Sequence, residues 1–276
     1  SIRGKYRSRR MEDIVKEARW LAENGVTELV VVAQDTTRYG EDIYGKSMLP
    51  ELLTALCEID GFKWIRTLYC YPERITDELL DVIAKEDKLV KYLDMPIQHC
   101  NKTILKRMNR HGDRETLTAL IKKIREKIPN VTLRTTLITG FPGETEEQFE
   151  ELCEFVKEIR FERLGCFAYS PEEGTPAEKF EDQVPLKDRE RRAEIIMEEQ
   201  MIISDSFNEA ALDSEVEVVC EGFDRYAECY YGRSQADAPE IDGKIFFLSE
   251  DKVRVGEYVK VKIDDTMDYD LIGSKM

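Results

Sequence analysis

Five stretches between residues 11 and 170 end in polar or aromatic side chains, and each stretch is typical of a buried β-strand that leads into a helix. Alternating strands and helices form parallel sheets, in which ligands bind at the carboxyl ends of the strands. Amide, hydroxyl, carboxylate and aromatic groups gathered there would bind a polar ligand. In chain order, the candidate residues are Gln34, Asp35, Thr36, Tyr69, Tyr71, Gln98, His99, Thr139, Gly140, Phe141, Phe167 and Tyr169.

The fourth of these ends, LRTTLITGFPGETEEQ, carries two glycines. Thr145 and Gln148 fit a capping box that opens the next helix, which is a purely structural role. That role does not explain Gly140 and Gly143. A glycine at the end of a strand lets a ligand approach the backbone closely, so this turn is the strongest single indication of a binding site.

Arg134 precedes that turn on the same strand. Side chains alternate along a strand, so Arg134, Thr136 and Ile138 share one face. Pointing a charge at a layer of helices is costly, and we therefore expect Arg134 to point into the barrel. There it would pair with an anionic group of a ligand or with an acid such as Asp94; a buried structural pair is the alternative.

Five β/α repeats position these residues. Apolar runs predict strands over 25–34, 64–71, 91–98, 131–140 and 163–170. Apolar residues at helical spacing predict helices over 11–22, 49–59, 76–87, 114–128 and 145–159. This alternation indicates an α/β domain with a parallel sheet, either open or closed into a barrel.

A second domain follows a loop over 171–188 and a long charged helix over about 186–211. Short alternating strands over 215–223, 243–248 and 255–263 predict a small all-β barrel. We therefore divide the chain into domains 1–211 and 212–276. Residues 213–276 carry a net charge of −8, half of the total of −16.

The composition excludes several classes of protein. A charge of −16 disfavours general binding to nucleic acid and suits a basic partner, although solubility alone would explain it. The seven cysteines lack CxxC spacing and there are only two histidines, so we expect no zinc site within these residues. Scattered cysteines without a disulfide pattern are typical of a protein in the reducing cytoplasm, and we expect that location. No apolar run is long enough to span a membrane.

The turn ITGFPGET resembles the GxIxGxxE-like motif of radical S-adenosylmethionine (SAM) enzymes. Together with MPIQH, ILKRMNR, YSPEEGTPA and the terminal β-barrel, it makes the whole chain similar to the radical SAM methylthiotransferase family. The resemblance implies a partial parallel (β/α) barrel followed by a TRAM domain. It also implies SAM and two [4Fe–4S] clusters as cofactors of the full-length protein, and an electron donor such as flavodoxin or ferredoxin.

The resemblance also assigns roles to the strand-end residues. Thr139, Gly140 and Phe141 would lie along the adenosine part of SAM, with Phe167 and Tyr169 beside the adenine. Gln98 and Arg134 would reach the ribose hydroxyls or the carboxylate, and Gln34 the methionine portion. The substrate side would be formed by residues on three strand ends, namely Asp35, Thr36, Tyr69, Tyr71 and His99. Cys70, Cys100 and Cys166 are more simply explained as packed side chains.

Two branches of this family differ in substrate. One modifies an adenosine in tRNA, and the other modifies the β-carbon of an aspartate in small-subunit ribosomal protein S-twelve. AQDTTRYG, LYCYPERIT and PIQH all resemble the ribosomal-protein branch, and the acidic second domain suits a basic protein better than tRNA. The alternatives are tRNA modification and, from a different class, a non-catalytic binding module.

The first ten residues, SIRGKYRSRR, resemble the segment that follows the CxxxCxxC cluster loop in this family. The resemblance therefore implies that the first barrel strand and the cluster cysteines lie upstream of Ser1. On that basis we expect these 276 residues alone to bind no iron and to be inactive.

Overall fold

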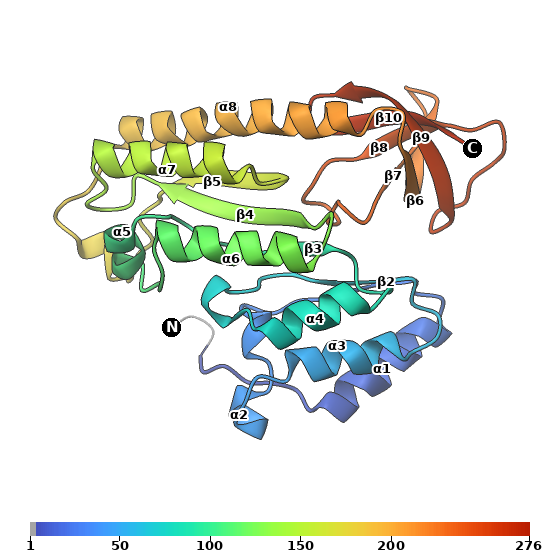
Figure 1. Ribbon diagram of the computed structural model, residues 1–276, viewed down its shortest axis with the longest axis horizontal. Helices are drawn as coiled ribbons and strands as arrows, with labels where there is room; N and C mark the ends of the chain where they lie inside the picture. Colours follow the sequence, from blue (N-terminus) through green and yellow to red (C-terminus); the bar gives the residue numbers. More distant parts are fainter. Residues whose placement is uncertain (1–3) are drawn as a thin grey trace. The chain divides into compact units, whose positions relative to one another are not determined.

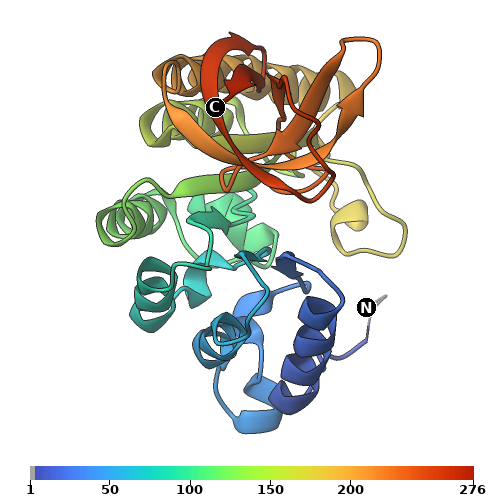
Figure 2. The ribbon, with the colours of Figure 1, turned by 90° about the vertical axis from the view of Figure 1, so that its right-hand side faces the viewer.

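The computed structural model describes residues 4–276, which divide into two compact units (Figures 1 and 2). The first runs up to Pro96 and adds Ala119–Val131, and the second contains Ile97–Thr118 and Thr132–Met276. This division does not follow the predicted boundary at residues 211 and 212, because the second unit contains β4 and β5 together with the C-terminal barrel. The two-domain division stays a prediction.

The first unit is a small parallel sheet with helices. Its elements are α1 (Met11–Glu23), β1 (Glu28–Val31), the 3-10 turn η1 (Thr36–Arg38), α2 (Glu41–Tyr44), α3 (Leu49–Cys57), β2 (Trp64–Thr67), the 3-10 turn η2 (Pro72–Arg74), α4 (Asp77–Lys85) and β3 (Tyr92–Asp94). Strand β1 pairs with β2 in parallel, with Leu29 opposite Ile65. Leu53 and Leu56 of α3 and Leu80 of α4 are fully buried, so one apolar face of each helix builds the core.

The strands of this unit are shorter than predicted. The apolar stretch over 64–71 continues beyond β2, but Tyr69 adopts a left-handed backbone with φ of 58°. The chain therefore turns while its side chains are still apolar or aromatic. The N–H of Cys70 then donates to the carbonyl of Asp94 at 2.8 Å, which holds the end of β2 beside β3.

The second unit contains a parallel pair of strands and a closed barrel. Its elements are α5 (Lys102–Arg107), β4 (Thr132–Thr139), α7 (Glu146–Ile159), β5 (Arg163–Ala168), the 3-10 turn η3 (Ala177–Lys179), α8 (Leu186–Ala210), β6 (Glu215–Asp224), β7 (Cys229–Arg233), β8 (Ile245–Leu248), β9 (Tyr258–Met267) and β10 (Asp270–Lys275). Helix α6 (Arg114–Lys127) has residues in both units.

Strand β4 has the two faces that its sequence predicts. Leu133, Thr135 and Leu137 are fully buried, whereas Arg134 and the alternate residues after it are half-buried. Strand β4 pairs with β5 in parallel, with Leu137 opposite Cys166, and helices α7 and α8 lie side by side along these strands (Figure 1).

The predicted capping box at the start of α7 is confirmed. The Thr145 side chain accepts from the N–H of Gln148, and the Gln148 side chain accepts from the N–H of Thr145.

Helix α8 is the long charged helix that the sequence predicts, and it has 25 residues. It nevertheless buries Arg189, Arg192, Gln200 and Asn208. Neither α8 nor any other helix in the described part of the chain combines the length and the apolar character needed to cross a bilayer.

The C-terminal barrel closes through strands in the order β10, β8, β7, β6 and β9 (Figure 2). Val218, Phe247 and Val261 belong to its buried core. Strands β7 and β10 were not predicted, because each is short and contains a glycine that interrupts the alternation of apolar and polar residues. The small all-β barrel itself is confirmed.

Candidate functional site

In the first unit, two polar side chains hold the strand ends together. The Thr36 hydroxyl donates to the carbonyl of Leu68 at 2.9 Å, and the N–H of Thr36 donates to the carbonyl of Tyr69 at 3.0 Å. The Asp94 carboxylate accepts from the N–H of Tyr69 at 3.0 Å. These buried bonds fix the left-handed backbone of Tyr69, whose ring is 41% exposed. An aromatic ring held out from a rigid turn is suited to contact a ligand.

Asp35 is the other charged residue of this cluster. Its carboxylate caps η1 by accepting from the N–H of Thr37, and its Oδ2 lies 3.6 Å from Arg74 Nε. Burial raises the pKa of Asp35, although the hydrogen bonds from Thr37 and the charge of Arg74 lower it in part. Oδ2 is buried and accepts no hydrogen bond from residues 4–276, so its nearby charge is that of Arg74.

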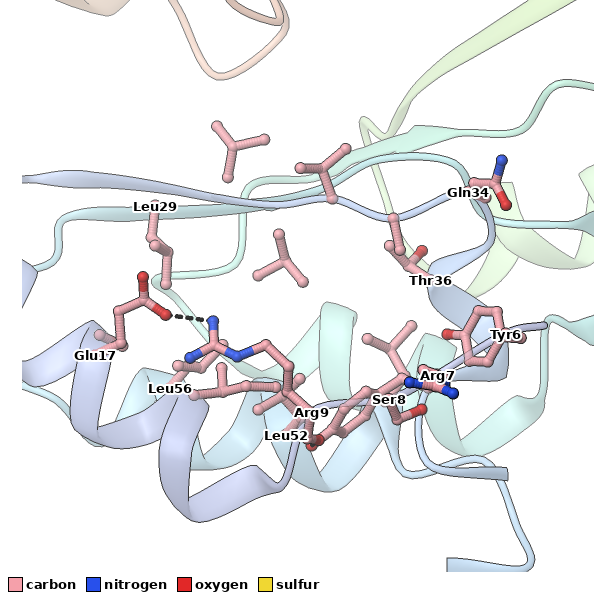
Figure 3. A pocket seen from close by; sticks show the side chains of 18 of the residues that line it. Tyr6, Arg7, Ser8, Arg9, Glu17, Leu29, Gln34, Thr36, Leu52 and Leu56 are labelled. Carbon is pink, nitrogen blue, oxygen red and sulfur yellow. Dashed lines mark hydrogen bonds and ion pairs between the residues drawn. The ribbon is translucent and has the colours of Figure 1, made fainter. Parts of the chain in front are cut away.

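A cavity of about 710 Å³ opens beside β1 (Figure 3). Leu29 of β1 and Leu52 and Leu56 of α3 point into it, while Gln34 and Thr36 lie at one end. Within the described residues β1 pairs with β2 alone, so its other edge faces this space. The cavity therefore has apolar walls from β1 and α3, while residues 5–9 line it with polar and charged side chains, of which Arg9 pairs with Glu17 (Figure 3).

In the second unit, the turn after β4 is built around Gly140. Gly140 has φ of +68°, and a Cβ there would lie 2.7 Å from Cβ of Arg189 and closer still to its Cγ. The N–H of Gly140 donates to both carboxylate oxygens of Glu144 at 3.0 Å. The sequence therefore requires glycine at this position for two reasons, the left-handed backbone and the close approach of α8.

The side chains on either side of Gly140 point into the protein. Thr139 is fully buried and its hydroxyl donates to the carbonyl of Arg189 at 3.1 Å. Phe141 packs edge-on against Tyr169, with ring centroids 5.1 Å apart. Thr139, Phe141 and Tyr169 could therefore meet a ligand mainly through their backbone. Phe167 is different, because its ring on β5 is 61% exposed.

Gln98 lies beside β4, where its N–H donates to the carbonyl of Thr136 at 2.9 Å and its carbonyl accepts from Ile138 at 2.8 Å. Its backbone is left-handed, with φ of 73°. Its side-chain Oε1 is buried and accepts no hydrogen bond from residues 4–276. A strained residue with an unsatisfied amide oxygen is a strong candidate for binding a hydroxyl group.

The structure separates Arg134 from this strand-end group. Arg134 is the third residue of β4 and Thr139 the eighth, so their backbones lie about 16 Å apart. Arg134 Nε lies 3.5 Å from Asp242 Oδ1, a residue of the C-terminal barrel. Arg134 is half-buried and has Asp242 as an acidic partner; the carboxylate of Asp94, which the sequence suggested as a partner, accepts from the N–H of Tyr69.

The remaining candidates divide between the two units. Gln34, Asp35, Thr36, Tyr69 and Tyr71 belong to the first, and Tyr71 is the half-buried residue before η2. Gln98, His99, Thr139, Gly140, Phe141, Phe167 and Tyr169 belong to the second. Buried packing is confirmed for Cys70 and Cys100, whereas Cys166 is only partly buried.

Sequence reasoning missed Glu144, Arg189 and Arg192, which surround the Gly140 turn. Glu144 directly follows Gly143 in the stretch LRTTLITGFPGETEEQ, so its place in the glycine turn could have marked it as a residue that contacts the turn. The two arginines lie four and seven residues before Ile196, on the face of α8 that also buries Ile203, so helical spacing was the signal that could have marked them as buried.

An amide oxygen and an aromatic ring are the kinds of group that contact a nucleoside, and Gln98 and Phe167 offer them beside β4 and on β5. Among residues 4–276, no three His, Cys, Asp or Glu side chains are grouped so that they could hold a metal ion.

Comparison with known proteins agrees with the predicted fold. Residues 1–156 match the family model of the radical SAM superfamily, and residues 214–275 match that of the TRAM domain. The structure of coproporphyrinogen III oxidase (HemN) from Escherichia coli, a radical SAM enzyme, covers 74% of this chain with a TM-score of 0.52. The likeness covers 48% of that protein at 22% identity, so it supports the fold alone.

Curated relatives are much more similar in sequence. The chain is 50% identical over 272 residues to ribosomal protein uS12 methylthiotransferase RimO of Clostridium tetani, covering 99% of this chain and 61% of that protein. It is 52% identical over 273 residues to the protein of the same name from Lachnoclostridium phytofermentans, covering 62% of it. The chain thus spans about three-fifths of the length of these relatives.

Proposed function

Because this chain belongs to the radical SAM superfamily, we propose that the whole protein attaches a methylthio group to the β-carbon of an aspartate in ribosomal protein uS12. The observation that carries the proposal is the 50–52% identity, over 99% of this chain, to relatives named for that reaction.

The C-terminal barrel supports a protein substrate. Sixteen acidic and eight basic residues in 213–276 give it a charge of −8. A module that grips tRNA contacts phosphates with Lys and Arg, whereas an acidic surface attracts a basic ribosomal protein. The resemblance adds an electron donor of the flavodoxin or ferredoxin class and a cytoplasmic location to the proposal.

The residues of the second unit would hold the adenosyl part of SAM. Gln98 Oε1 would accept a hydrogen bond from a ribose hydroxyl, which would satisfy its buried oxygen. The exposed ring of Phe167 would stack on the adenine, and the backbone beside Gly140 would approach it closely. When bound with its cluster, SAM supplies the radical chemistry needed to remove hydrogen from an unactivated carbon.

The residues of the first unit would act on the substrate side. Asp35 and Tyr69 are fixed by Thr37, Arg74 and Asp94, so little reorganisation would be needed when a peptide arrives. The role of this chain is then to bind, orient and exclude water, while the cofactors provide the reactive group.

The test uses the full-length protein, reconstituted anaerobically with iron and sulfide. It is incubated with SAM, a reductant, and either a peptide of the uS12 target loop or substrate tRNA, and the products are weighed by mass spectrometry. A gain of one methylthio group on the peptide aspartate is expected. A gain on tRNA instead, or on neither, would overturn the proposal.

Salt dependence provides an independent check. Binding of the basic uS12 to this chain should weaken steeply as salt increases, because the attraction is between opposite charges. The double substitution Asp264→Asn with Asp265→Asn removes two exposed acids of the barrel and should weaken the binding of uS12 further. Tight, salt-sensitive binding of tRNA would favour the nucleic-acid branch.

A further inference from the structure

Helix α8 directs two arginines at the turn that follows β4. The buried face of α8 also contains Ile196 and Ile203, but at its start the buried residues are charged: Arg189 is 8% and Arg192 only 5% exposed. Burying two guanidinium groups is costly unless they are paired. Their partners therefore indicate what the burial achieves.

Arg192 pairs with the carboxylate that fixes Gly140. Its Nη1 donates to Glu144 Oε1 at 2.7 Å and to the Glu144 carbonyl at 3.2 Å. The Glu144 carboxylate is fully buried and accepts from the N–H of Gly140. Arg192 thus fixes the position of the acid, and the acid fixes the backbone of Gly140.

His99 lies beside the same carboxylate. Its Nδ1 accepts from the N–H of Asn101 at 2.9 Å, which fixes the orientation of the ring. Nε2 lies 3.4 Å from Glu144 Oε2, and both side chains are fully buried. Glu144 is therefore surrounded by a guanidinium, an imidazole and a backbone N–H.

Arg189 holds the turn from the opposite side. Its carbonyl accepts from the Thr139 hydroxyl, and its Nη1 donates to the carbonyl of Tyr169 at 3.0 Å. Its aliphatic carbons fill the space that a side chain at Gly140 would occupy. The ends of β4 and β5 are thus both attached to one helix.

We propose that Arg189 and Arg192 are positioning residues that set the place of the Thr139–Gly140–Phe141 backbone and thereby the affinity for the adenosyl group of SAM. The inference rests on the proposed function, because it needs SAM at this turn. The physical reason is that a binding backbone must be held within a fraction of an ångström, and a glycine turn has no side chain of its own to hold it.

The helix extends this role beyond the turn. At its far end, the Asn208 side chain donates to the carbonyl of Asp268 in the C-terminal barrel at 2.9 Å. One continuous helix therefore holds the turn of the nucleoside site and the module that we propose meets the protein substrate.

The experiment compares Arg192→Gln with Arg191→Gln in the full-length reconstituted protein. Arg191 is the matched control, since it is exposed and pairs with Glu146 but not with Glu144. Three quantities are measured: the dissociation constant for SAM, the hydrogen-exchange rate of the Gly140 amide, and the KM values for SAM and for the uS12 peptide. Arg192→Lys is the conservative variant, which keeps the charge if the glutamine variant folds poorly.

We expect Arg192→Gln to weaken SAM binding about tenfold, because the variant loses its charged hydrogen bonds to Glu144 and Glu146 and the Gly140 backbone is then less firmly held. Exchange at Gly140 should accelerate, KM for SAM should rise, and KM for the peptide should not change. Arg192→Lys should restore part of the affinity, and Arg191→Gln should resemble the wild type.

A second control separates positioning from stability. Leu152→Ala removes a fully buried side chain of α7 and lowers stability without touching the Glu144 carboxylate. If Leu152→Ala weakens SAM binding as much as Arg192→Gln does, the role of Arg192 is only structural and the inference is wrong. Unchanged SAM affinity in Arg192→Gln would also overturn it. If the wild type itself binds no SAM, the proposed function fails, and the inference fails with it.

Discussion

Arg163, the first residue of β5, donates from Nη2 to Asp237 Oδ1 in the C-terminal barrel at 2.7 Å. Asp237 is 3% exposed, and its second oxygen accepts from the Ser234 hydroxyl. Its carbonyl accepts from Arg233 at 3.0 Å. With Arg134 and Asp242 nearby in the same interface, ion pairs attach the barrel to the start of the β4–β5 sheet.

Asp237→Asn should therefore destabilise the second unit. Removing one charge of a nearly buried pair leaves the other without compensation, and we expect a loss of roughly 2–3 kcal/mol in the free energy of unfolding. Urea denaturation measures it. Asp213→Asn is the control, because its pair with Lys262 is exposed and should contribute little. Equal effects from the two variants would contradict a fixed barrel.

Gly140→Ala should cost about 3 kcal/mol of stability, because the new Cβ would clash with Arg189 and the backbone would be strained. Gly174→Ala provides the comparison, since Gly174 also has a positive φ but has open space around it. We expect about 1 kcal/mol there, from the backbone alone. Thermal and urea unfolding of the two variants would show the difference.

The free energy of unfolding of Asp35→Asn should increase relative to that of the wild type as the pH rises. The native pKa of Asp35 is raised by burial, so the native state holds its proton more tightly than the unfolded chain does. The stability that this group provides is present below the unfolded pKa and is lost as the pH rises through the native value. Urea curves of both proteins from about pH 3 to about pH 7 test this. A constant difference would contradict it.

Cys70 should resist alkylation in the native protein. The side chain is fully buried, and burial raises the pKa of its thiol to about 12. Only the thiolate reacts, so a mildly alkaline solution contains almost none. Mass spectrometry after iodoacetamide treatment should find Cys70 unmodified until urea is added. Modification without denaturant would show that the strand end opens readily.

Phe141→Ala should mainly lower stability, whereas Phe167→Ala should mainly weaken SAM binding. Phe141 is buried against Tyr169 and Phe180, so its removal should cost about 3 kcal/mol of stability. Phe167 is mostly exposed, so its removal should leave stability nearly unchanged and weaken SAM binding. Calorimetry and a binding titration separate the two effects. Unaltered SAM affinity in Phe167→Ala would remove this ring from the site.

The repeating pattern of strands and helices is a local property, and the sequence alone predicts it. Apolar spacing predicts α1, α3, α4, α6, α7 and α8, and the Thr145 and Gln148 pair predicts where α7 begins. Alternation along β4 predicts which of its side chains share a face. Gly140 is identifiable because a glycine that ends a buried strand indicates a left-handed turn or a close approach to the backbone.

Only the tertiary structure decided the partners of the charged residues. The sequence predicts that Arg134 lies in β4. Its ion pair is with Asp242, which is more than a hundred residues away in the sequence. Arg189 and Arg192 lie on the same face of α8 as the buried Ile196 and Ile203, but only the packed structure shows that their partners are Tyr169 and Glu144. The spacing of apolar residues indicates which face of a helix or strand is buried. Pairing between charges that are distant in the sequence depends on how the elements pack against one another, and no local pattern predicts that packing.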